Sequence, residues 1–127
     1  MTRSRILLLD DEAPILDIMS LFLKRNGYDV VCSQSGSDAL SVFREEYSSQ
    51  KKIDLAILDV SIPGDIGAKE ILEPMREIDP DICVIITSGD SVHGAMDDPL
   101  KFGFSGSLKK PFRSTELIEI VKEVLKD

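Results

Sequence analysis

Four short runs of apolar residues stand out along the chain. They are Ile6 to Leu9, Val30 to Cys32, Leu55 to Leu58 and Cys83 to Ile86. Between these runs the apolar residues recur at helical spacing, every three or four positions. An uninterrupted apolar run is typical of a strand buried on both faces, so the alternation predicts βαβ units around a parallel sheet.

Four helices are predicted from apolar stripes along one side of each segment. Gly27 ends the first helix just after Asn26, and Asp79-Pro80 ends the third. In chain order the stripes are Ile15, Leu16, Met19, Phe22 and Leu23; Leu40, Phe43 and Tyr47; Ile71, Leu72, Met75 and Ile78; and Leu117, Ile118, Val121, Val124 and Leu125.

The pattern is weaker over residues 88–102, because Gly94 and Pro99 interrupt it. Asp97-Asp98-Pro99 has the form of a helix cap followed by proline in the first turn, so a short or displaced fourth helix is expected there. A short fifth strand is expected near Gly106 to Lys109. The pattern therefore predicts five strands and five helices in a single domain over residues 1–127, with no linker or internal repeat.

The charge balance narrows the class of partner. The chain has 15 basic and 23 acidic residues and a net charge of -8. This charge opposes direct binding to nucleic acid and suits partners that are proteins or cations. The apolar runs are too short to span a bilayer and no signal-peptide pattern is present, so we expect a cytoplasmic protein or the soluble part of a larger one, without membrane contact by this domain.

The two cysteines and the single histidine suggest no chemistry of their own. Cys32 ends one apolar run and Cys83 begins another, where a free thiol behaves as a small buried hydrophobe. Two cysteines and one histidine cannot form a zinc site of the usual kind, and we expect no disulfide. His93 is expected to be exposed and without a role.

Polar residues with reactive side chains follow four of the five predicted strands. They are Asp10-Asp11 after the first strand, Asp59 after the third, Thr87-Ser88 after the fourth and Lys109-Lys110 after the fifth. The second strand ends in Cys32-Ser33 and offers nothing comparable. A doubly wound sheet of strand order 2-1-3-4-5 accounts for this difference, because it puts strand 2 at an edge and the other four strands side by side. We therefore predict one crevice that contains all the candidate groups.

Three carboxylates in one crevice repel one another unless a cation or protons relieve the repulsion. Mg²⁺ takes oxygen ligands and commonly binds carboxylates together with a phosphate oxygen, which suits Asp10, Asp11, Asp59 and a nearby backbone carbonyl. Phosphoryl transfer also needs an in-line nucleophile and groups that neutralise the equatorial oxygens. Asp59 is the candidate nucleophile, with the Thr87 hydroxyl and the Lys110 ammonium as the stabilising groups.

Together these residues resemble the receiver domain of two-component response regulators, over essentially the whole chain. The matching motifs are Asp10-Asp11, the stretch from Leu55 to Gly64 around Asp59, Thr87-Ser88-Gly89 and Lys110-Pro111-Phe112. The resemblance implies an α/β fold of the flavodoxin-like (βα)5 type, in which helices cover both faces of a five-stranded parallel sheet.

By this resemblance Asp59 accepts a phosphoryl group from a histidine kinase or a histidine phosphotransfer domain. Mg²⁺, or Mn²⁺ in its place, would be held by Asp10, Asp11, Asp59 and the backbone carbonyl of Ser61. The domain would be no enzyme beyond its own phosphorylation and dephosphorylation. It would switch contacts with a downstream output protein through the fourth helix, fifth strand and fifth helix. The Lys110–Pro111 bond is expected to be cis, as in the family.

A narrower resemblance and two departures refine this expectation. The stretches Pro63 to Gly67, Ile85 to Gly89 and Gly103 to Gly106 are most similar to receivers of hybrid sensor histidine kinases. The chain would then be an excised domain, in the cytoplasmic part of a membrane-attached kinase, or a single-domain relay protein. Ser107 replaces the family's usual aromatic residue, so the usual coupling of a rotating ring to the Thr87 hydroxyl cannot operate. Ile62 replaces a frequent methionine.

Each candidate residue also has an ordinary structural interpretation. Asp10 and Asp11 could cap the first helix, and Asp59 could form a turn before Pro63-Gly64. Thr87 suits a strand because it is β-branched, and Lys110 could simply be solvated. Their joint placement at four neighbouring strand ends is what favours a site.

Three other functions remain as alternatives. A flavin or nucleotide binder needs a Gly/Ser/Thr-rich loop after the first strand, where this chain has Asp10-Asp11-Glu12. An aspartate-dependent phosphatase often has a second acid two residues after its nucleophile, where this chain has Ser61. The third alternative is a degenerate receiver that acts only as a docking module. The complete set Asp10, Asp11, Asp59, Thr87 and Lys110 argues against it.

Overall fold

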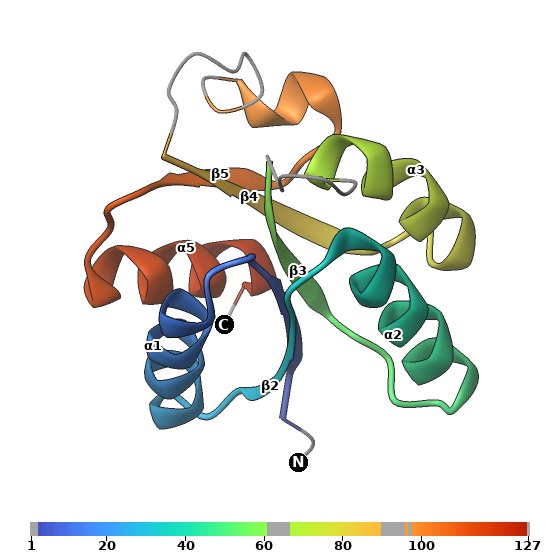
Figure 1. Ribbon diagram of the computed structural model, residues 1–127, viewed down its shortest axis with the longest axis horizontal. Helices are drawn as coiled ribbons and strands as arrows, with labels where there is room; N and C mark the ends of the chain where they lie inside the picture. The colour runs from blue at the N-terminus through green and yellow to red at the C-terminus, as the bar shows by residue number, and fades with distance from the viewer. Residues whose placement is uncertain (1–2, 61–66, 90–95, 97, 127) are drawn as a thin grey trace.

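A five-stranded parallel sheet forms the centre of the molecule (Figure 1). The computed structural model describes residues 3–60, 67–89, 96 and 98–126. The strands are β1 (Arg5–Leu9), β2 (Asp29–Ser33), β3 (Leu55–Asp59), β4 (Cys83–Ser88) and β5 (Gly106–Lys109). Their order across the sheet is β2-β1-β3-β4-β5, which confirms the predicted order 2-1-3-4-5.

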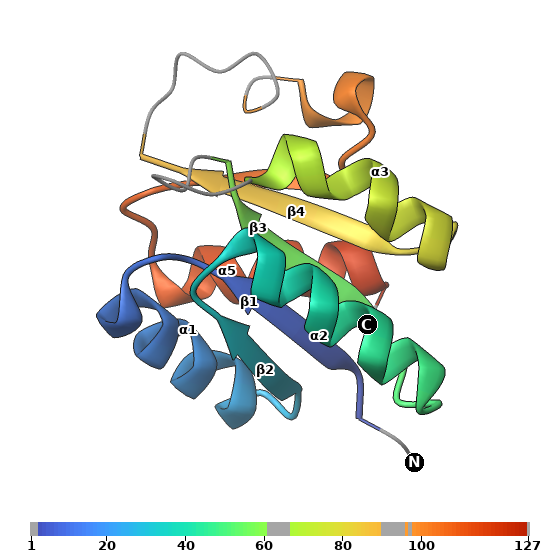
Figure 2. The same cartoon turned by 45° about the vertical axis from the view of Figure 1, so that its right-hand side comes forward.

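Helices cover both faces of this sheet. The described residues contain α1 (Ala13–Arg25), α2 (Gly36–Ser48), α3 (Ala68–Ile78) and α5 (Ser114–Leu125), together with the short 3-10 helix η1 (Pro99–Phe102). Helices α1 and α5 lie on one face, and α2 and α3 lie on the other (Figures 1 and 2). Over the described parts of the chain, no helix has the length and apolar character that crossing a membrane requires.

Strands β1, β3 and β4 are mainly apolar because both of their faces are buried. In β1, Leu7 and Leu9 belong to the apolar cluster under α2 and α3, whereas Ile6 and Leu8 belong to the cluster under α1 and α5. Strand β3 is buried along its whole length, down to Asp59 at its end. Alternate side chains thus enter opposite layers of the core, which fixes the strands and the direction in which their ends point.

Several helical details differ from the sequence-based expectation. Glu12, and neither Asp10 nor Asp11, is the N-cap residue of α1. Tyr47 was expected in the buried stripe of α2 but is 42% exposed, because it lies in the last turn of the helix. At the end of α1, Gly27 adopts a φ of 90°, a left-handed conformation that favours glycine.

The predicted fourth helix falls mostly outside the described residues, as does His93. The described part is η1, in which Pro99 occupies the first turn directly after Asp98. Asp98 makes no side-chain capping bond, so the predicted proline position is observed without the predicted cap. Within the described residues, four of the five predicted helices are α-helices, and Met96 and η1 are what is described of the region of the fourth.

The expectation that Cys32 is buried was wrong. Cys32 is exposed and Cys83 is partly buried, and both are free thiols. The reason is topological: β2 is an edge strand with a neighbour on one side only, and its middle residues are incompletely covered. An apolar run in the sequence does not distinguish an edge strand from a central one.

Close approach of α3 to the end of β3 requires glycine at position 67. A Cβ atom on Gly67 would lie 2.3 Å from the backbone oxygen of Val60, which follows Asp59. We expect Gly67→Ala to lower the free energy of unfolding by about 1–3 kcal/mol, because the backbone of Val60 must shift to admit the methyl group. Denaturant unfolding monitored by circular dichroism measures this change.

Gly89→Ala is the matched control for this substitution, since a Cβ atom at Gly89 would have no neighbour within 4 Å. We expect the control to unfold within about 0.5 kcal/mol of the original protein. Equal stability of the two variants would show that the approach of Gly67 to Val60 is not a packing constraint.

Candidate acidic site

The four strand ends that the sequence singled out meet at one edge of the sheet. Asp10 follows β1, Asp59 is the last residue of β3, and Lys110 follows β5. Thr87 lies in β4 directly opposite Asp59 in the register of the sheet. The parallel arrangement brings them together, because every strand presents its carboxyl end at the same edge.

Three of these residues form a cluster of carboxylates. Oxygen atoms of Asp10, Asp11 and Asp59 all lie within 4.8 Å of one another. Asp10 and Asp59 are buried, at 2% and 6% exposure, whereas Asp11 is exposed. The predicted grouping of the three acids is therefore present, with one side open to solvent.

Lys110 binds two of the three acids. Its Nζ atom lies 2.5 Å from Oδ2 of Asp10 and 3.0 Å from Oδ2 of Asp59. Burial of the side chain opposes its charge, but the hydrogen bonds and the charges of Asp10 and Asp59 outweigh burial and raise the pKa of Lys110. The lysine is thus held protonated between the carboxylates, and the solvated alternative does not apply to it.

Asp10 also shapes the turn that leads into α1. Its Oδ1 atom accepts a hydrogen bond of 2.9 Å from the backbone N–H of Glu12, two residues ahead. An aspartate that bonds the backbone two residues on forms a turn, which is a different role from capping a helix. The carboxylate of Asp10 therefore holds the loop through Oδ1 and Lys110 through Oδ2.

Of the remaining predicted residues, Thr87 is described and Ser61 is not. Thr87 is buried, and its backbone carbonyl accepts a hydrogen bond of 2.9 Å from the N–H of Val60. This bond extends the pairing of β3 and β4 by one residue beyond Asp59. Ser61 and Ile62 lie outside the described residues, so the backbone carbonyl expected to bind metal is not described.

A family model of the response regulator receiver domain matches residues 6–122. The chain belongs to this family.

Solved receiver domains have the same fold as this one. The CheY-like receiver domain protein from Methanospirillum hungatei JF-1 is 26% identical, with a TM-score of 0.85 over 98% of this chain and 95% of that one. A receiver domain protein from Clostridium thermocellum is 28% identical, with a TM-score of 0.81 over 97% and 94%. In the CheX-CheY-BeF3-Mg+2 complex from Borrelia burgdorferi, a chain that is 20% identical shares the fold, with a TM-score of 0.84 over 95% and 88%.

Beside the acids of this receiver domain lies an apolar hollow that the sequence reasoning missed. Its volume is about 550 Å³, and α1 contributes Ile15 and Ile18 to its wall. Lys110, Pro111 and Phe112 contribute the other side, and the Lys110–Pro111 bond is cis, as the resemblance implied. The signal in the sequence was Ile18, an apolar residue outside the inward stripe of α1, which is 53% exposed.

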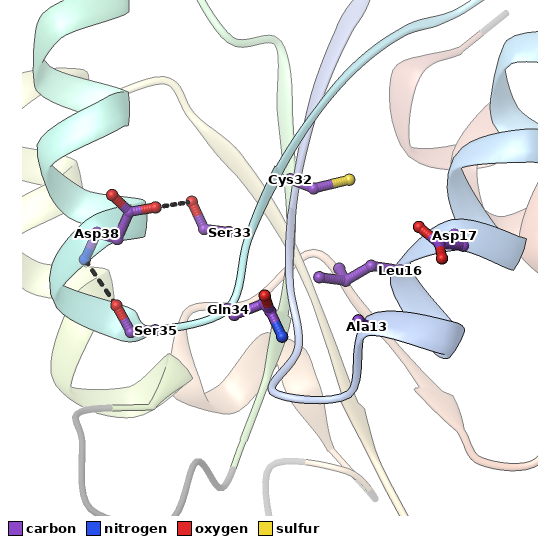
Figure 3. A pocket seen from close by; sticks show the side chains of 8 residues that line it. All are labelled: Ala13, Leu16, Asp17, Cys32, Ser33, Gln34, Ser35 and Asp38. Atoms are coloured by element: carbon purple, nitrogen blue, oxygen red, sulfur yellow. Dashed lines mark hydrogen bonds between the residues drawn. The ribbon is translucent and has the colours of Figure 1, made fainter.

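A second hollow of about 490 Å³ lies at the end of β2 (Figure 3). Ser33 donates a hydrogen bond of 2.8 Å to Asp38, whose backbone N–H donates to the Ser35 hydroxyl at 3.2 Å. Cys32 points toward α1, away from these groups (Figure 3). The polar groups at this strand end serve the start of α2, in agreement with the expectation that the second strand contributes nothing comparable.

Loss of the Lys110 ammonium is expected to destabilise this receiver domain in metal-free buffer. Lys110→Met keeps a long side chain but leaves Asp10 and Asp59 close together without their cation. We expect the free energy of unfolding to fall by up to about 3 kcal/mol near pH 7. Because the folded-state pKa of Lys110 is raised, the deficit persists below the lysine's ordinary pKa of 10.5 and shrinks as the pH rises through the folded-state value.

Lys109→Met is the matched control, because Lys109 is the neighbouring exposed lysine of β5. Denaturant unfolding of both variants at several pH values between 7 and 11 gives the comparison. An equal loss of stability in the two variants would contradict a specific role for the ion pairs of Lys110.

Proposed function

We propose that Asp59 is the phosphoacceptor of this receiver domain. The observation that supports the proposal is that Asp59 lies beside two further carboxylates and receives a 3.0 Å contact from the Lys110 ammonium. A carboxylate oxygen of Asp59 attacks phosphorus in a phosphohistidine, forming the acyl phosphate P–O bond. The P–N bond breaks at the same centre, and its electron pair returns to the imidazole nitrogen, which then takes up a proton.

The acid cluster fits a divalent cation with oxygen ligands. Three ionised carboxylates facing one lysine leave two negative charges uncompensated, which matches the charge of Mg²⁺ or Mn²⁺. The exposed position of Asp11 leaves room for the waters that Mg²⁺ usually retains. We infer that Asp10, Asp11 and Asp59 hold the ion, with the Ser61 carbonyl as a further ligand. When bound, it neutralises charge on the phosphoryl oxygens.

Lys110 and Thr87 complete the proposed site. Lys110 already touches Asp59 and can contact a phosphoryl oxygen after a small movement. Thr87 lies opposite Asp59 on the neighbouring strand, where its hydroxyl can donate to another oxygen. The domain thereby promotes only its own phosphorylation and dephosphorylation.

The alternative functions are less well supported. The loop after β1 contains acids in place of the phosphate-binding N–H groups that a nucleotide or flavin site needs. The three acids lie close together and Lys110 contacts two of them, so a degenerate receiver is not favoured. A phosphatase is less well supported because such enzymes often have a second acid two residues after the nucleophile, where this chain has Ser61.

The phosphodonor is proposed to be a histidine kinase or histidine phosphotransfer domain, in the cytoplasm. The apolar hollow beside Lys110 supports a protein donor, because its wall offers Ile15, Ile18 and Phe112 next to the acceptor site. The similarity of three stretches to receivers of hybrid sensor kinases supports the proposal that such a kinase contains this domain, residues 1–127, with a single-domain relay protein as the alternative. Phosphorylation is proposed to change the surface formed by the fourth helix, β5 and α5, and so to alter binding of an output protein.

Phosphorylation of Asp59 can be tested by intact mass spectrometry. We expect one phosphoryl group on the protein after incubation with acetyl phosphate and Mg²⁺, and none on Asp59→Asn or when EDTA replaces the metal. Asp38→Asn is the control, because Asp38 is an acid outside the site that bonds Ser33. An adduct on Asp59→Asn, or none on the original protein with either a small donor or a phosphorylated kinase, would falsify the proposed acceptor.

Docking of the protein donor can be separated from the chemistry. We expect Ile18→Asp to slow phosphotransfer from a phosphorylated histidine kinase at least about tenfold, since a charge in the apolar hollow opposes burial by the partner. The rate with acetyl phosphate should be unchanged, because Ile18 is not among the reacting groups. Rapid-quench measurement of both rates gives the comparison.

Tyr47→Asp is the control for this substitution, because Tyr47 is an exposed apolar residue on α2 that does not line the hollow. We expect it to leave both rates as they are. If Ile18→Asp and Tyr47→Asp behave alike toward the kinase, the donor does not dock on the hollow beside Lys110.

A further inference from the structure

The end of β2 supplies no reacting group, but it contacts the loop that contains Asp10 and Asp11. This loop joins β1 to α1. The backbone N–H of Asp10 donates a hydrogen bond of 3.2 Å to the carbonyl of Ser33, the last residue of β2. This bond extends the pairing of β1 and β2 by one residue beyond Leu9. The peptide unit just before the two acids is therefore held by β2.

Gln34, the residue after β2, holds the same loop on the other side of the acids. Its side-chain amide donates a hydrogen bond of 3.4 Å from Nε2 to the backbone carbonyl of Asp11. The side chain of Gln34 points toward the ribbon that joins β1 to α1 (Figure 3). Ser33 and Gln34 thus bond the backbone on both sides of the acid pair, one before Asp10 and the other after Asp11.

Both polar groups of the peptide unit between Asp11 and Glu12 are bonded. Its N–H, which belongs to Glu12, donates a hydrogen bond of 2.9 Å to Oδ1 of Asp10. Its carbonyl, which belongs to Asp11, accepts the bond from Gln34. Because a peptide unit is planar and its N–H and C=O point in opposite directions, it cannot rotate without breaking these bonds. The orientation of this plane determines the direction of the Asp11 side chain, since the plane is attached directly to the Cα atom of Asp11.

Asp11 depends on its backbone more than the other two acids do. Asp10 and Asp59 are buried, and both contact the Lys110 ammonium. Asp11 is exposed, and among the described residues its carboxylate makes no hydrogen bond or ion pair. The conformation of the loop therefore determines where the carboxylate oxygens of Asp11 lie relative to the other two acids.

We propose that Gln34 is a positioning residue for the divalent-cation site, and that its bond to the Asp11 carbonyl keeps the Asp11 carboxylate within reach of the ion. The inference rests on the proposed function, in which Asp10, Asp11 and Asp59 bind Mg²⁺. Without this bond, the peptide unit after Asp11 is held at one edge only, and the carboxylate adopts more orientations. Binding of Mg²⁺ must then restrict these orientations, which lowers the affinity.

The expected effect is a modest loss of affinity. One hydrogen bond corresponds to about a 2- to 13-fold change in an equilibrium constant. The bond from Gln34 is exposed, and its length of 3.4 Å exceeds the usual range of about 2.7–3.2 Å, so the lower part of this span applies. We expect Gln34→Met, which keeps the length of the side chain without a donor, to raise the Kd for Mg²⁺ about 2- to 5-fold. Gln34→Asn keeps the amide but is one methylene shorter, so it should behave like Gln34→Met.

Titration of ¹⁵N-labelled protein with MgCl₂, followed through the backbone amide chemical shifts, measures this affinity without phosphorylation. The same variants are then phosphorylated with acetyl phosphate over a series of Mg²⁺ concentrations. Gln34→Met is expected to need about 2- to 5-fold more Mg²⁺ for its half-maximal rate and to reach the original rate at saturating Mg²⁺. This result separates the positioning of an ion ligand from damage to the reacting groups.

Ser35→Ala is the matched control, because Ser35 is the next residue and its hydroxyl bonds the start of α2 instead of the acid loop. Loss of this helix cap should lower the melting temperature and leave the Mg²⁺ affinity unchanged. An equal weakening of Mg²⁺ binding in Ser35→Ala and Gln34→Met would show a general effect of the residues between β2 and α2 and would overturn the role of Gln34.

The remaining outcomes separate this proposal from the proposed acceptor. Mg²⁺ binding by Gln34→Met that matches the original protein overturns the positioning role and leaves phosphorylation of Asp59 intact. A lower rate at saturating Mg²⁺ with unchanged affinity also overturns it, because the defect then lies outside the metal site. Failure of the original protein to bind Mg²⁺ overturns the metal site and the role of Gln34 together, whereas the intact-mass experiment on Asp59→Asn tests the acceptor separately.

Discussion

Repulsion among the carboxylates of Asp10, Asp11 and Asp59 is the constraint around which the acidic site is arranged. The sheet forces these groups together, since the ends of β1 and β3 are neighbours and Asp10 and Asp59 are buried there. Lys110 offsets part of this repulsion through contacts of 2.5 Å and 3.0 Å, at the cost of burying its own charge. A cluster held in this way is poised for ligands that bring positive charge or that replace Asp59 as a partner of the lysine.

The two apolar layers supply the rigidity that such a cluster needs. Leu7 and Leu9 point into one layer and Ile6 and Leu8 into the other, so β1 cannot shift without disturbing both. At the end of β3, Gly67 brings the start of α3 against the backbone of Val60 and limits movement beside Asp59. The packing of the core therefore determines the positions of the strand ends that contain the acidic residues.

Two different surfaces flank the acidic site on the two faces of the sheet. The hollow between α1 and the Lys110–Pro111 turn is apolar and opens next to the acids. On the other face of the sheet, Ser107 and Arg76 hold the backbone around η1, where Leu100 and Phe102 are exposed. Strand β5 borders both, because it contains Ser107 and is followed directly by Lys110.

The sequence by itself determined the sheet order and the meeting of Asp10, Asp11, Asp59 and Lys110, because apolar periodicity and the residue after each strand are local properties that parallel topology turns into a site. Tertiary structure alone decided how far each position is covered and which side chains touch. Cys32 has the same apolar flank as a central-strand residue, yet β2 lies at the edge and leaves it exposed. Lys110 contacts Asp10 as well as Asp59, and the Ser107 hydroxyl donates a hydrogen bond to the Met96 carbonyl. The sequence did not predict these pairs, because they depend on distances between chain segments that no local pattern specifies.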